Sequence, residues 1–284
     1  MSRMRAVRSF VAGSLAVGSS MTLAPEALAQ QAVQWRVEDG GNGHWYLGVS
    51  VGKDLSWFVA KHDAELTGGH LATVTSAAED DFVWSVASNH ALWTEVQGSG
   101  WTGAKGPWLG LFQSPGNSPA EGWSWVTGEE FVFDAWTDGE PNDGCASLGD
   151  ENALNYLGAV PGVRRWNDFP GDIPCGAWGF PQSYILEWSA DCNNDGIVDY
   201  GQILAGELED ANNNGVPDCC DAGVNCDPCA GDVTRNGSID GIDLAAVLAA
   251  WGGGKSQYDC DIDDDGIVGG SDLAAVLAGW GACP

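Results

Sequence analysis

Two short polar motifs constrain the fold of this chain more than any other part of its sequence. The first is Glu140-Pro141-Asn142 and the second is Trp166-Asn167-Asp168, with Glu151 between them. Together they offer three carboxylates and two amides, without thiolate or imidazole. Such hard oxygen donors suit Ca²⁺ rather than zinc or copper. We therefore expect the fold to gather five metal ligands from separate segments: Glu140, Asn142, Glu151, Asn167 and Asp168.

Pro141 bears on how the first motif is built. X-Pro peptide bonds adopt the cis form at low cost, and a cis bond would turn the side chains of Glu140 and Asn142 toward the same side. The alternative is that both motifs are turns in an acidic, Gly-rich region, because Pro, Asn and Asp are common turn residues. Both motifs occur in this order with Glu151 between them, and this combination favours the metal site.

The composition limits the classes of partner. The chain has 284 residues, 15 of them Trp, and a formal net charge of −29. This length allows one large or two ordinary domains, and the aromatic content is ample for a core. A protein this acidic should repel nucleic acid and anionic membranes. Much of its acid is Asp interleaved with Asn and Gly, which favours metal-binding loops over a disordered acidic tail.

Residues 1–29 have the features of a secretory signal peptide. Three arginines among the first eight residues precede an apolar run from Phe10 to Leu23, and Ala27-Leu28-Ala29 is a small-x-small cleavage site. A short membrane anchor is the alternative, although Gly and Ser interrupt the run. No later stretch has the ~20 apolar residues of a spanning helix. We expect cleavage near Ala29 and a secreted, periplasmic or cell-surface protein with disulfides.

Residues 30–189 predict an α+β domain with two helices, small antiparallel sheets and a long loop region. Strands are expected at 43–49, 108–111, 123–125 and 184–188. A helix should begin at Ser56, bury Trp57, Ala60, Ala64 and Leu66, and stop at Gly68-Gly69. The spacing of Ser76 and Glu79 is that of a capping box and predicts a second helix.

In order and spacing, five motifs of residues 33–189 resemble those of C-type lectin domains: Gly68-Gly69-His70-Leu71-Ala72, Trp108-Leu109-Gly110-Leu111, Glu140-Pro141-Asn142, Trp166-Asn167-Asp168 and the terminal Leu186-Glu187-Trp188. The resemblance implies that the five expected ligands hold a sugar-binding Ca²⁺. It also implies that Glu140, Asn142, Glu151 and Asn167 contact the carbohydrate. In that family, Glu-Pro-Asn goes with mannose-, glucose- or fucose-type ligands.

The cysteines depart from the family pattern. The usual outer disulfide would join positions 64 and 186, which are Ala and Leu here, and the first cysteine of the inner one would be at Ala153. Cys145 and Cys175 instead flank the expected site, and we predict that they pair. A disulfide closing a loop of ~30 residues contributes about 3–4 kcal/mol by the chain-entropy estimate.

Residues 190–229 are predicted to be a calcium-repeat segment. Two loops with alternating oxygen donors before a Gly resemble the first half of an EF-hand loop and thrombospondin type 3-like repeats. A polar linker is the alternative. The cysteines of this segment favour structural disulfides over zinc or redox use, with the pairing left open for Cys192, Cys219, Cys220, Cys226 and Cys229. The expected ligands are Asp191, Asn193, Asp195 and Asp199 in the first loop, and Asp210, Asn212, Asn214 and Asp218 in the second.

Residues 230–284 contain a duplicated loop and helix. In each helix, Leu, Val, Leu and Trp recur at i, i+3, i+4 and i+7, so we expect two apolar stripes that bury each other. Each loop has EF-hand spacing, with Gly at position 6 and Asp at position 12. Cys260 is a candidate partner for Cys283, and Cys229 competes. The expected ligands are Asp232, Thr234, Asn236, Asp240 and Asp243 in the first loop, and Asp261, Asp263, Asp265 and Asp272 in the second.

This duplication resembles type I dockerin domains, which are small α-helical pairs of EF-hand type that dock onto cohesin modules. The resemblance implies attachment to a cohesin-like or other protein. Positions 10 and 11 of the loops, which often carry Ser or Thr in dockerins, are Gly241-Ile242 and Gly270-Ser271 here.

The expected function is calcium-dependent carbohydrate binding without catalysis. Glu140, Glu151 and Asp168 could in principle form a glycosidase acid/base pair, but a bound Ca²⁺ would lower their pKa values, whereas a general acid needs a raised one. Two alternatives stay open: a protein-binding or structural C-type lectin-like module with purely structural calcium, and a non-catalytic subunit of a polysaccharide-degrading assembly.

Overall fold

The structure is a computed structural model that describes residues 31–98, 101–145, 150–158, 164–193, 195–223, 226–227, 229–253, 258–263 and 265–283. The predicted signal peptide lies outside these residues. Every residue predicted as a metal ligand lies within them. Over the described part of the chain, no helix combines the length and the apolar character needed to cross a bilayer.

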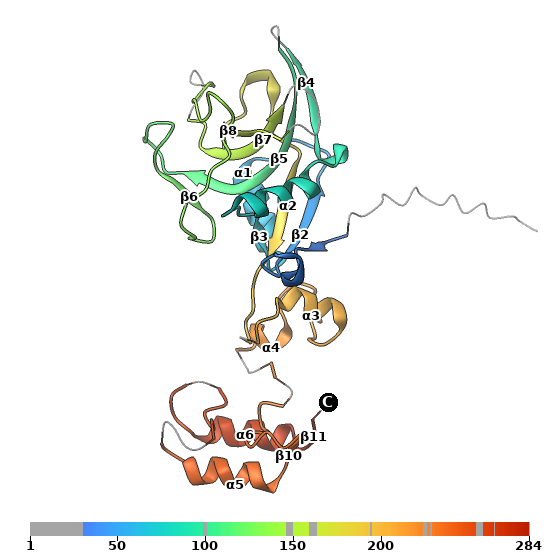
Figure 1. Ribbon diagram of the computed structural model, residues 1–284, viewed down its shortest axis with the longest axis vertical. Coiled ribbons are helices and arrows are strands. Elements are labelled where there is room, and N and C mark those ends of the chain that lie inside the picture. The colour runs from blue at the N-terminus through green and yellow to red at the C-terminus, as the bar shows by residue number, and fades with distance from the viewer. Residues whose placement is uncertain are drawn as a thin grey trace, which may run out of the picture. The chain divides into compact units, whose positions relative to one another are not determined.

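One nine-stranded sheet organises the N-terminal half (Figure 1). Its main path runs β1-β2-β9-β5-β7-β8; β3 pairs with β9, and β4 and β6 pair with β5. All neighbours are antiparallel except β5 and β9, which run parallel. The strands are β1 (Val33–Gln34), β2 (Trp45–Ser50), β3 (His70–Leu71), β4 (Thr94–Gly98), β5 (Trp101–Gln113), β6 (Trp123–Trp125), β7 (Ala153–Gly158), β8 (Trp166–Phe169) and β9 (Ser183–Trp188).

The pairing of β2 with β9 closes this half of the molecule on itself. Trp45 lies opposite Trp188 and Ser50 lies opposite Ser183, so an early strand and the last strand of residues 31–189 are neighbours along their full length. These residues therefore form a mixed α+β unit, as the sequence predicts. A parallel bridge joins Trp108 of β5 to Tyr184 of β9 and connects this strand pair to the β5-β7-β8 part of the sheet.

Two helices and three short 3₁₀ segments complete this half: α1 (Trp57–Glu65), α2 (Ala77–Ala87), η1 (Val37–Asp39), η2 (His90–Leu92) and η3 (Gly176–Trp178). Ser56 caps α1 by accepting a hydrogen bond from the Val59 amide, as expected. The prediction for Leu66 is wrong: it ends the helix and is 61% exposed. It lies beyond the last helical residue, where α1 no longer faces the sheet.

The start of α2 differs in one detail from a capping box. Ser76 accepts a hydrogen bond from the Glu79 amide, as expected. The Glu79 carboxylate, however, accepts from the amide and hydroxyl of Thr75 and from the hydroxyl of Tyr46. Glu79 is only 3% exposed, so it links the helix to the interior.

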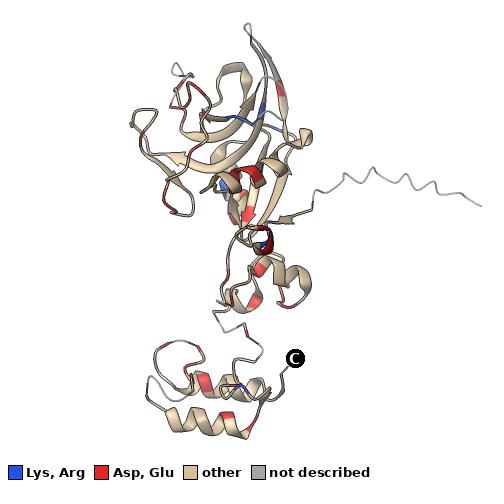
Figure 2. Cartoon of the chain, in the orientation of Figure 1, with Lys and Arg blue, Asp and Glu red and all other residues tan. Residues whose placement is uncertain are grey.

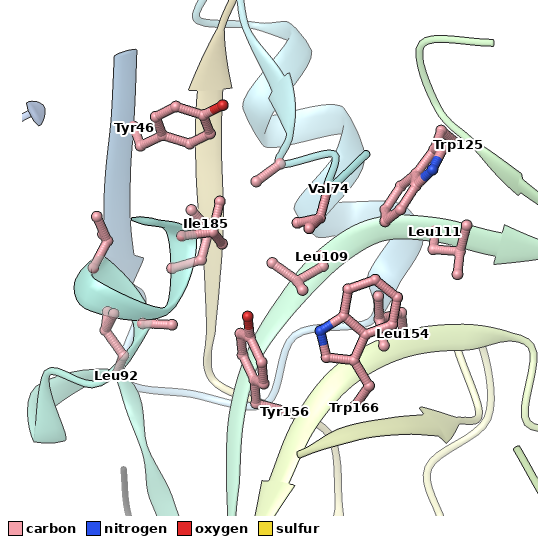
Figure 3. Close-up of a cluster of buried hydrophobic side chains, with 14 of the residues drawn as sticks. Tyr46, Val74, Leu92, Leu109, Leu111, Trp125, Leu154, Tyr156, Trp166 and Ile185 are labelled. Carbon is pink, nitrogen blue, oxygen red and sulfur yellow. The ribbon is translucent and has the colours of Figure 1, made fainter. Parts of the chain in front are cut away.

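The core of residues 31–189 consists of two clusters rich in aromatic side chains. Figure 3 shows the first, in which Leu109, Tyr156 and Trp166 are fully buried. The second surrounds Trp57, Trp108, Tyr184 and Trp188 and also contains Ala64 and Leu186, the two positions that lack the family's outer disulfide. Apolar packing thus occupies the place of that disulfide.

The middle segment contains two short helices that the sequence analysis did not predict, α3 (Asp199–Ala205) and α4 (Asp218–Asp221). Each begins at the last acidic residue of one predicted loop. The ring of Tyr200 stacks on Trp188 with centroids 3.8 Å apart. Disulfides join Cys192 to Cys220 and Cys219 to Cys226, in agreement with the preference for disulfides over zinc.

The C-terminal segment, taken by itself, is a helix pair with a short two-stranded sheet: β10 (Ser238–Ile239), α5 (Gly241–Ala250), α6 (Gly270–Ala278) and β11 (Gly281–Ala282). Val247 and Val276 are fully buried in its core. Cys283 pairs with Cys229, with Cα atoms 5.6 Å apart, which is the second of the two pairings that the sequence left open. Cys260 instead lies buried in the same core.

The expected mutual burial of the two apolar stripes is also only partly correct. Leu244, Val247, Leu273 and Val276 belong to the core. The second Leu and the Trp of each repeat are more than half exposed: Leu248, Trp251, Leu277 and Trp280. A pair of helices has no third layer, so each helix covers only part of the other's stripe. Figure 2 shows Asp and Glu along the same segment.

Candidate metal centre

The candidate metal centre is built where β7 and β8 meet the long loop after β6. The two strands pair with Asn155 opposite Asn167 and Leu154 opposite Asp168. Glu151 lies just before β7, and the loop carries Glu140 and Asn142. The Glu140–Pro141 peptide bond is cis, as the sequence suggests. The strand pair fixes two of the predicted ligands, and the loop brings the others to them.

Asp168 is the residue to which the loop is attached. It is completely buried, and its Oδ2 accepts hydrogen bonds from the amides of Asn142 and Asp143, both at 2.9 Å. Asp143 in turn accepts a hydrogen bond from the Glu151 amide at 3.1 Å. A chain of three hydrogen bonds therefore holds the first motif, the second motif and Glu151 together.

Side-chain oxygens converge beside Gly144. A Cβ atom added there would lie 2.5 Å from Asn142 Oδ1 and 3.5 Å from Glu151 Oε2. Glu140, Asn142, Glu151 and Asn167 all line one cavity of about 380 Å³. Four of the five predicted ligands thus share this cavity, and backbone hydrogen bonds tie the fifth, Asp168, to its edge.

Two carboxylate oxygens of the centre lack a hydrogen-bonding partner among the described residues. Glu140 Oε2 and Asp168 Oδ1 are buried and have no hydrogen-bond donor among the described residues. Burial raises the pKa of Glu140 to about 8; Asp168, which would share the proton, and the charge of Glu151 add to the shift. Burial and the charge of Asp168 raise the pKa of Glu151 to about 7. Burial also raises the pKa of Asp168.

These features fit a hard divalent cation. Three acidic groups that disfavour one another's charge, together with two orphaned oxygens, are stabilised by a positive ion at their centre. Carboxylate and amide oxygens are the ligands that Ca²⁺ prefers, and an ion that accepts 6–8 oxygens keeps positions for others. Glu140, Asn142, Glu151, Asn167 and Asp168 would hold it.

The cavity also has a wall that the sequence analysis missed. Thr137, Leu157, Arg165 and Trp178 line it, together with Cys145 and Cys175. The two cysteines form the expected disulfide, with Cα atoms 6.0 Å apart. Strand alternation was the available signal for Arg165: it lies two residues before Asn167, and such residues point to the same face of a strand.

The four acidic loops after residue 190 share one local geometry. In each, the first Asp accepts a hydrogen bond from the amide of the Gly at position 6, at 2.7–2.9 Å. Those glycines have φ between +79° and +89°, a conformation that favours Gly. The last Asp of each loop accepts from an amide near the loop's start. The first and last Asp of each loop are therefore tied to the loop's own backbone.

Two loop residues have additional partners. Asp240 caps α5 by accepting a hydrogen bond from the Ile242 amide at 2.7 Å. Thr234 donates its hydroxyl proton to Asp243 at 2.8 Å. The two loops of residues 230–284 are the first and the second tail loop. In the second, oxygens of Asp261, Asp263 and Asp265 lie within 4.8 Å of one another. In the first tail loop, Asp240 and Thr234 thus take part in local hydrogen bonds. In the second tail loop, three carboxylates converge.

A second buried polar cluster joins β2, α2 and β9. His44 Nδ1 lies 2.6 Å from Glu187 Oε1, and the Tyr46 hydroxyl donates to Glu79 at 2.9 Å. Burial lowers the pKa of His44, but the hydrogen bond and charge of Glu187 outweigh it and raise the pKa overall. Thr73 and Thr75 donate to the remaining carboxylate oxygens. No sequence motif marks this cluster, because its residues come from distant segments.

Comparison with known proteins returned one curated relative of note and no matching family model. Ladderlectin of Oncorhynchus mykiss is 33% identical over 132 residues, which cover 46% of this chain and 56% of ladderlectin. The chain thus spans about half the length of this relative. The match supports the C-type lectin-like domain expected from the five motifs, while the thrombospondin- and dockerin-like segments stay predictions.

Several solved structures are similar at lower identity. The C-type carbohydrate-recognition domain of cow CD23, solved in the presence of a GlcNAc2Man3 oligosaccharide, is 21% identical; the match covers 60% of this chain and 98% of that domain, with a TM-score of 0.39. Herring type II antifreeze protein is 18% identical, with 52% and 93% coverage and a TM-score of 0.37.

Proposed function

We propose that this chain is a secreted, non-catalytic, calcium-dependent carbohydrate-binding protein, and that its residues 30–189 form a C-type lectin domain. One observation carries the proposal. Among the described residues, no donor reaches two buried carboxylate oxygens, one of Asp168 and one of Glu140, and Glu140 lines a cavity of about 380 Å³. The cavity leaves room for a ligand beside the ion that those oxygens would bind.

The residues of the site have complementary roles toward a sugar. The Glu140 carboxylate accepts a hydrogen bond from a hydroxyl, and the Asn142 amide donates one to a hydroxyl oxygen. A bound Ca²⁺ would accept two neighbouring sugar hydroxyls as further oxygen ligands beside those of the protein. Charge-assisted hydrogen bonds are the stronger kind, but a polar site that buries little apolar surface gives weak single-site affinity. The Glu-Pro-Asn motif suggests mannose-, glucose- or fucose-type ligands.

The C-terminal segment is proposed to be a dockerin-like module that attaches the lectin domain to another protein. The half-exposed Leu248, Trp251, Leu277 and Trp280 support this role, because monomeric proteins rarely leave repeated large apolar side chains without a partner. The partner is cohesin-like or another protein, and a polysaccharide-degrading assembly is one setting for it.

A glycan array of the full chain, with calcium and with a chelator, tests the sugar-binding proposal. We expect binding to mannose-, glucose- or fucose-type glycans that the chelator abolishes. Glu140→Gln should abolish it too, whereas Asp138→Asn, which removes an exposed carboxylate from the same loop, should leave it intact. Binding that survives both the chelator and Glu140→Gln contradicts the mechanism. Calcium binding without glycan binding favours the alternative of a module with purely structural calcium.

A further inference from the structure

Arg165 stands beside the candidate metal centre at a distance suited to a saccharide. It directly precedes β8, and its carbonyl accepts a hydrogen bond from the Leu157 amide at 3.1 Å. Arg165 and Asn167 lie on the same face of this strand, about 7 Å apart along it. Both residues line the same cavity. A ligand held at Asn167 therefore has Arg165 within reach of its neighbouring substituents.

Cationic side chains are scarce in this chain. Asp and Glu outnumber Lys and Arg by 40 to 11. The adjacent Arg164 pairs with Asp80 and Asp81, and Arg36 pairs with Glu38. Arg165 is exposed, and within the described residues no carboxylate lies in ion-pair distance of its guanidinium. Because its guanidinium forms no ion pair with these carboxylates, Arg165 is available to bind an anionic group of a ligand.

The rest of the cavity wall suits the body of a sugar. Trp178 is half-buried at the end of η3, next to the Cys145–Cys175 disulfide, and Leu157 lies beside Arg165. Aromatic rings provide large apolar contact area, on which the C–H face of a pyranose can pack. The volume of about 380 Å³ lies in the range of small-ligand sites.

We propose, on the basis of the proposed lectin function, that the ligand is an anionic saccharide whose carboxylate or sulfate group binds the Arg165 guanidinium. Guanidinium groups bind such planar or tetrahedral oxyanions through two parallel hydrogen bonds, which adds orientation as well as energy. The hydroxyls of the sugar face Glu140 and Asn142, while its charged substituent faces Arg165. This arrangement makes the site selective among sugars that all satisfy the metal centre.

The test compares a neutral mannose- or glucose-type oligosaccharide with two derivatives of the same backbone, one bearing a uronic acid and one bearing a sulfate ester. Affinities are measured by calorimetry on the full chain with calcium. We expect at least one derivative to bind about tenfold more tightly than the neutral ligand, and the preference to shrink at high salt because exposed charges are screened. The derivative that gains affinity identifies the anion.

Three variants isolate the role of Arg165. Arg165→Gln should remove the preference and leave the neutral ligand within about twofold of its original affinity. Arg165→Lys should restore part of the preference, since the charge is kept but the bidentate geometry is lost. Arg36→Gln, which removes an arginine outside the cavity, should change nothing. An unchanged preference in Arg165→Gln overturns the proposal.

The outcome separates this inference from the function on which it rests. If the neutral ligand binds with calcium and neither derivative binds better, only the anion selectivity is wrong. If no oligosaccharide binds the unmodified chain with calcium, the lectin function fails and the inference fails with it.

Discussion

The candidate metal centre and the four acidic loops after residue 190 use the same oxygen donors but are assembled in different ways. The centre draws Glu140, Asn142, Glu151, Asn167 and Asp168 from separate segments, and β7 and β8 hold two of them. Each loop instead takes its donors from one short run of sequence. In three of the four loops the first Asp accepts hydrogen bonds from amides four and five residues later, as Asp232 does from Asn236 and Gly237. In the fourth, Asp261 accepts one from the amide of Gly266.

This difference has consequences for what each region can do. In each loop the backbone that carries the carboxylates also holds them in place, so their arrangement depends on the local fold of that loop. The centre rests on a sheet with a large aromatic core, so its carboxylates need not organise the fold. Within the described part of the chain, two of their oxygens have no donor, and Glu140 and Glu151 line a cavity. Calcium is therefore expected to shape the C-terminal segment and to serve ligand binding in the N-terminal half.

Removal of calcium should show the largest contrast between the two regions. The core of the C-terminal segment contains only seven buried apolar residues, whereas the first cluster of the N-terminal half has 17. Metal binding that organises a small domain is part of its folding free energy. We expect a chelator to lower amide-exchange protection in α5 and α6 by a hundredfold or more, while β2, β5 and β9 keep theirs. Hydrogen exchange with mass spectrometry on the full chain measures both.

The matched control is calcium added back in excess, which should restore protection in α5 and α6. If β2 and β9 lose protection along with the helices, calcium stabilises both halves, which contradicts the expected difference between them. If α5 and α6 keep their protection in the chelator, their loops do not need the ion to fold.

A change of pH should alter the calcium affinities of the two regions differently, and this effect should be smaller than that of calcium removal. The pKa values of Glu140 and Glu151 are raised to about 8 and about 7, so below these values protons occupy groups that the cation must displace. Calcium affinity of the centre should fall about tenfold or more from pH 8 to pH 6. In the first tail loop, burial raises the pKa of Asp243, but hydrogen bonds from Asp240 and Thr234 outweigh it and lower the pKa overall. The calcium affinity of this loop should therefore stay nearly constant from pH 8 to pH 6.

Calcium titrations at several pH values, on the full chain and on Glu140→Gln, measure this difference. The pH-dependent class of sites should be absent from the variant. A pH-dependent class that persists in Glu140→Gln assigns the effect to the loops and contradicts the interpretation.

Sequence patterns predicted the parts of the structure that depend on local or near-local rules. Ser56 and Ser76 cap their helices, the Glu140–Pro141 bond is cis, and Gly237 and Gly266 occupy the positive-φ position of their loops. Each of these follows from the chemistry of a few adjacent residues. The order of the five motifs supplied the fold class in the same way, through resemblance.

What the sequence did not reveal depends on which distant surfaces meet. Helical periodicity marked Leu248 and Trp251 as apolar but could not show that two helices are too few to cover them. The pairing of Cys229 with Cys283 depends on where the ends of the segment lie. Arg165 belongs to the cavity only because β7 and β8 are neighbours, and His44 meets Glu79 and Glu187 only through the fold.

The smallest expected effect is a gain of stability in calcium-free protein when Glu140 becomes Gln. The pKa of Glu140 is raised from 4.5 to about 8, so this group contributes stability below pH 4.5 that is lost as pH rises through 8. At pH 8 without calcium, Glu140→Gln should therefore stabilise the N-terminal half by about 1 kcal/mol, a value discounted for solvent screening. The gain should vanish near pH 4.5, where wild-type Glu140 is protonated as well.

Urea unfolding of calcium-free protein, followed by the near-UV signal of the buried tryptophans, measures this gain at both pH values. Asp138→Asn, with its exposed side chain, should be neutral at both. In the first tail loop, removal of the Asp243 carboxylate should have the opposite effect on stability. Its ionised form accepts hydrogen bonds from the amides of Thr234 and Asp240. Removing it should destabilise the C-terminal segment by about 1–3 kcal/mol. If Glu140→Gln is destabilising without calcium, the carboxylates are satisfied by the protein itself and the centre has no need of an ion.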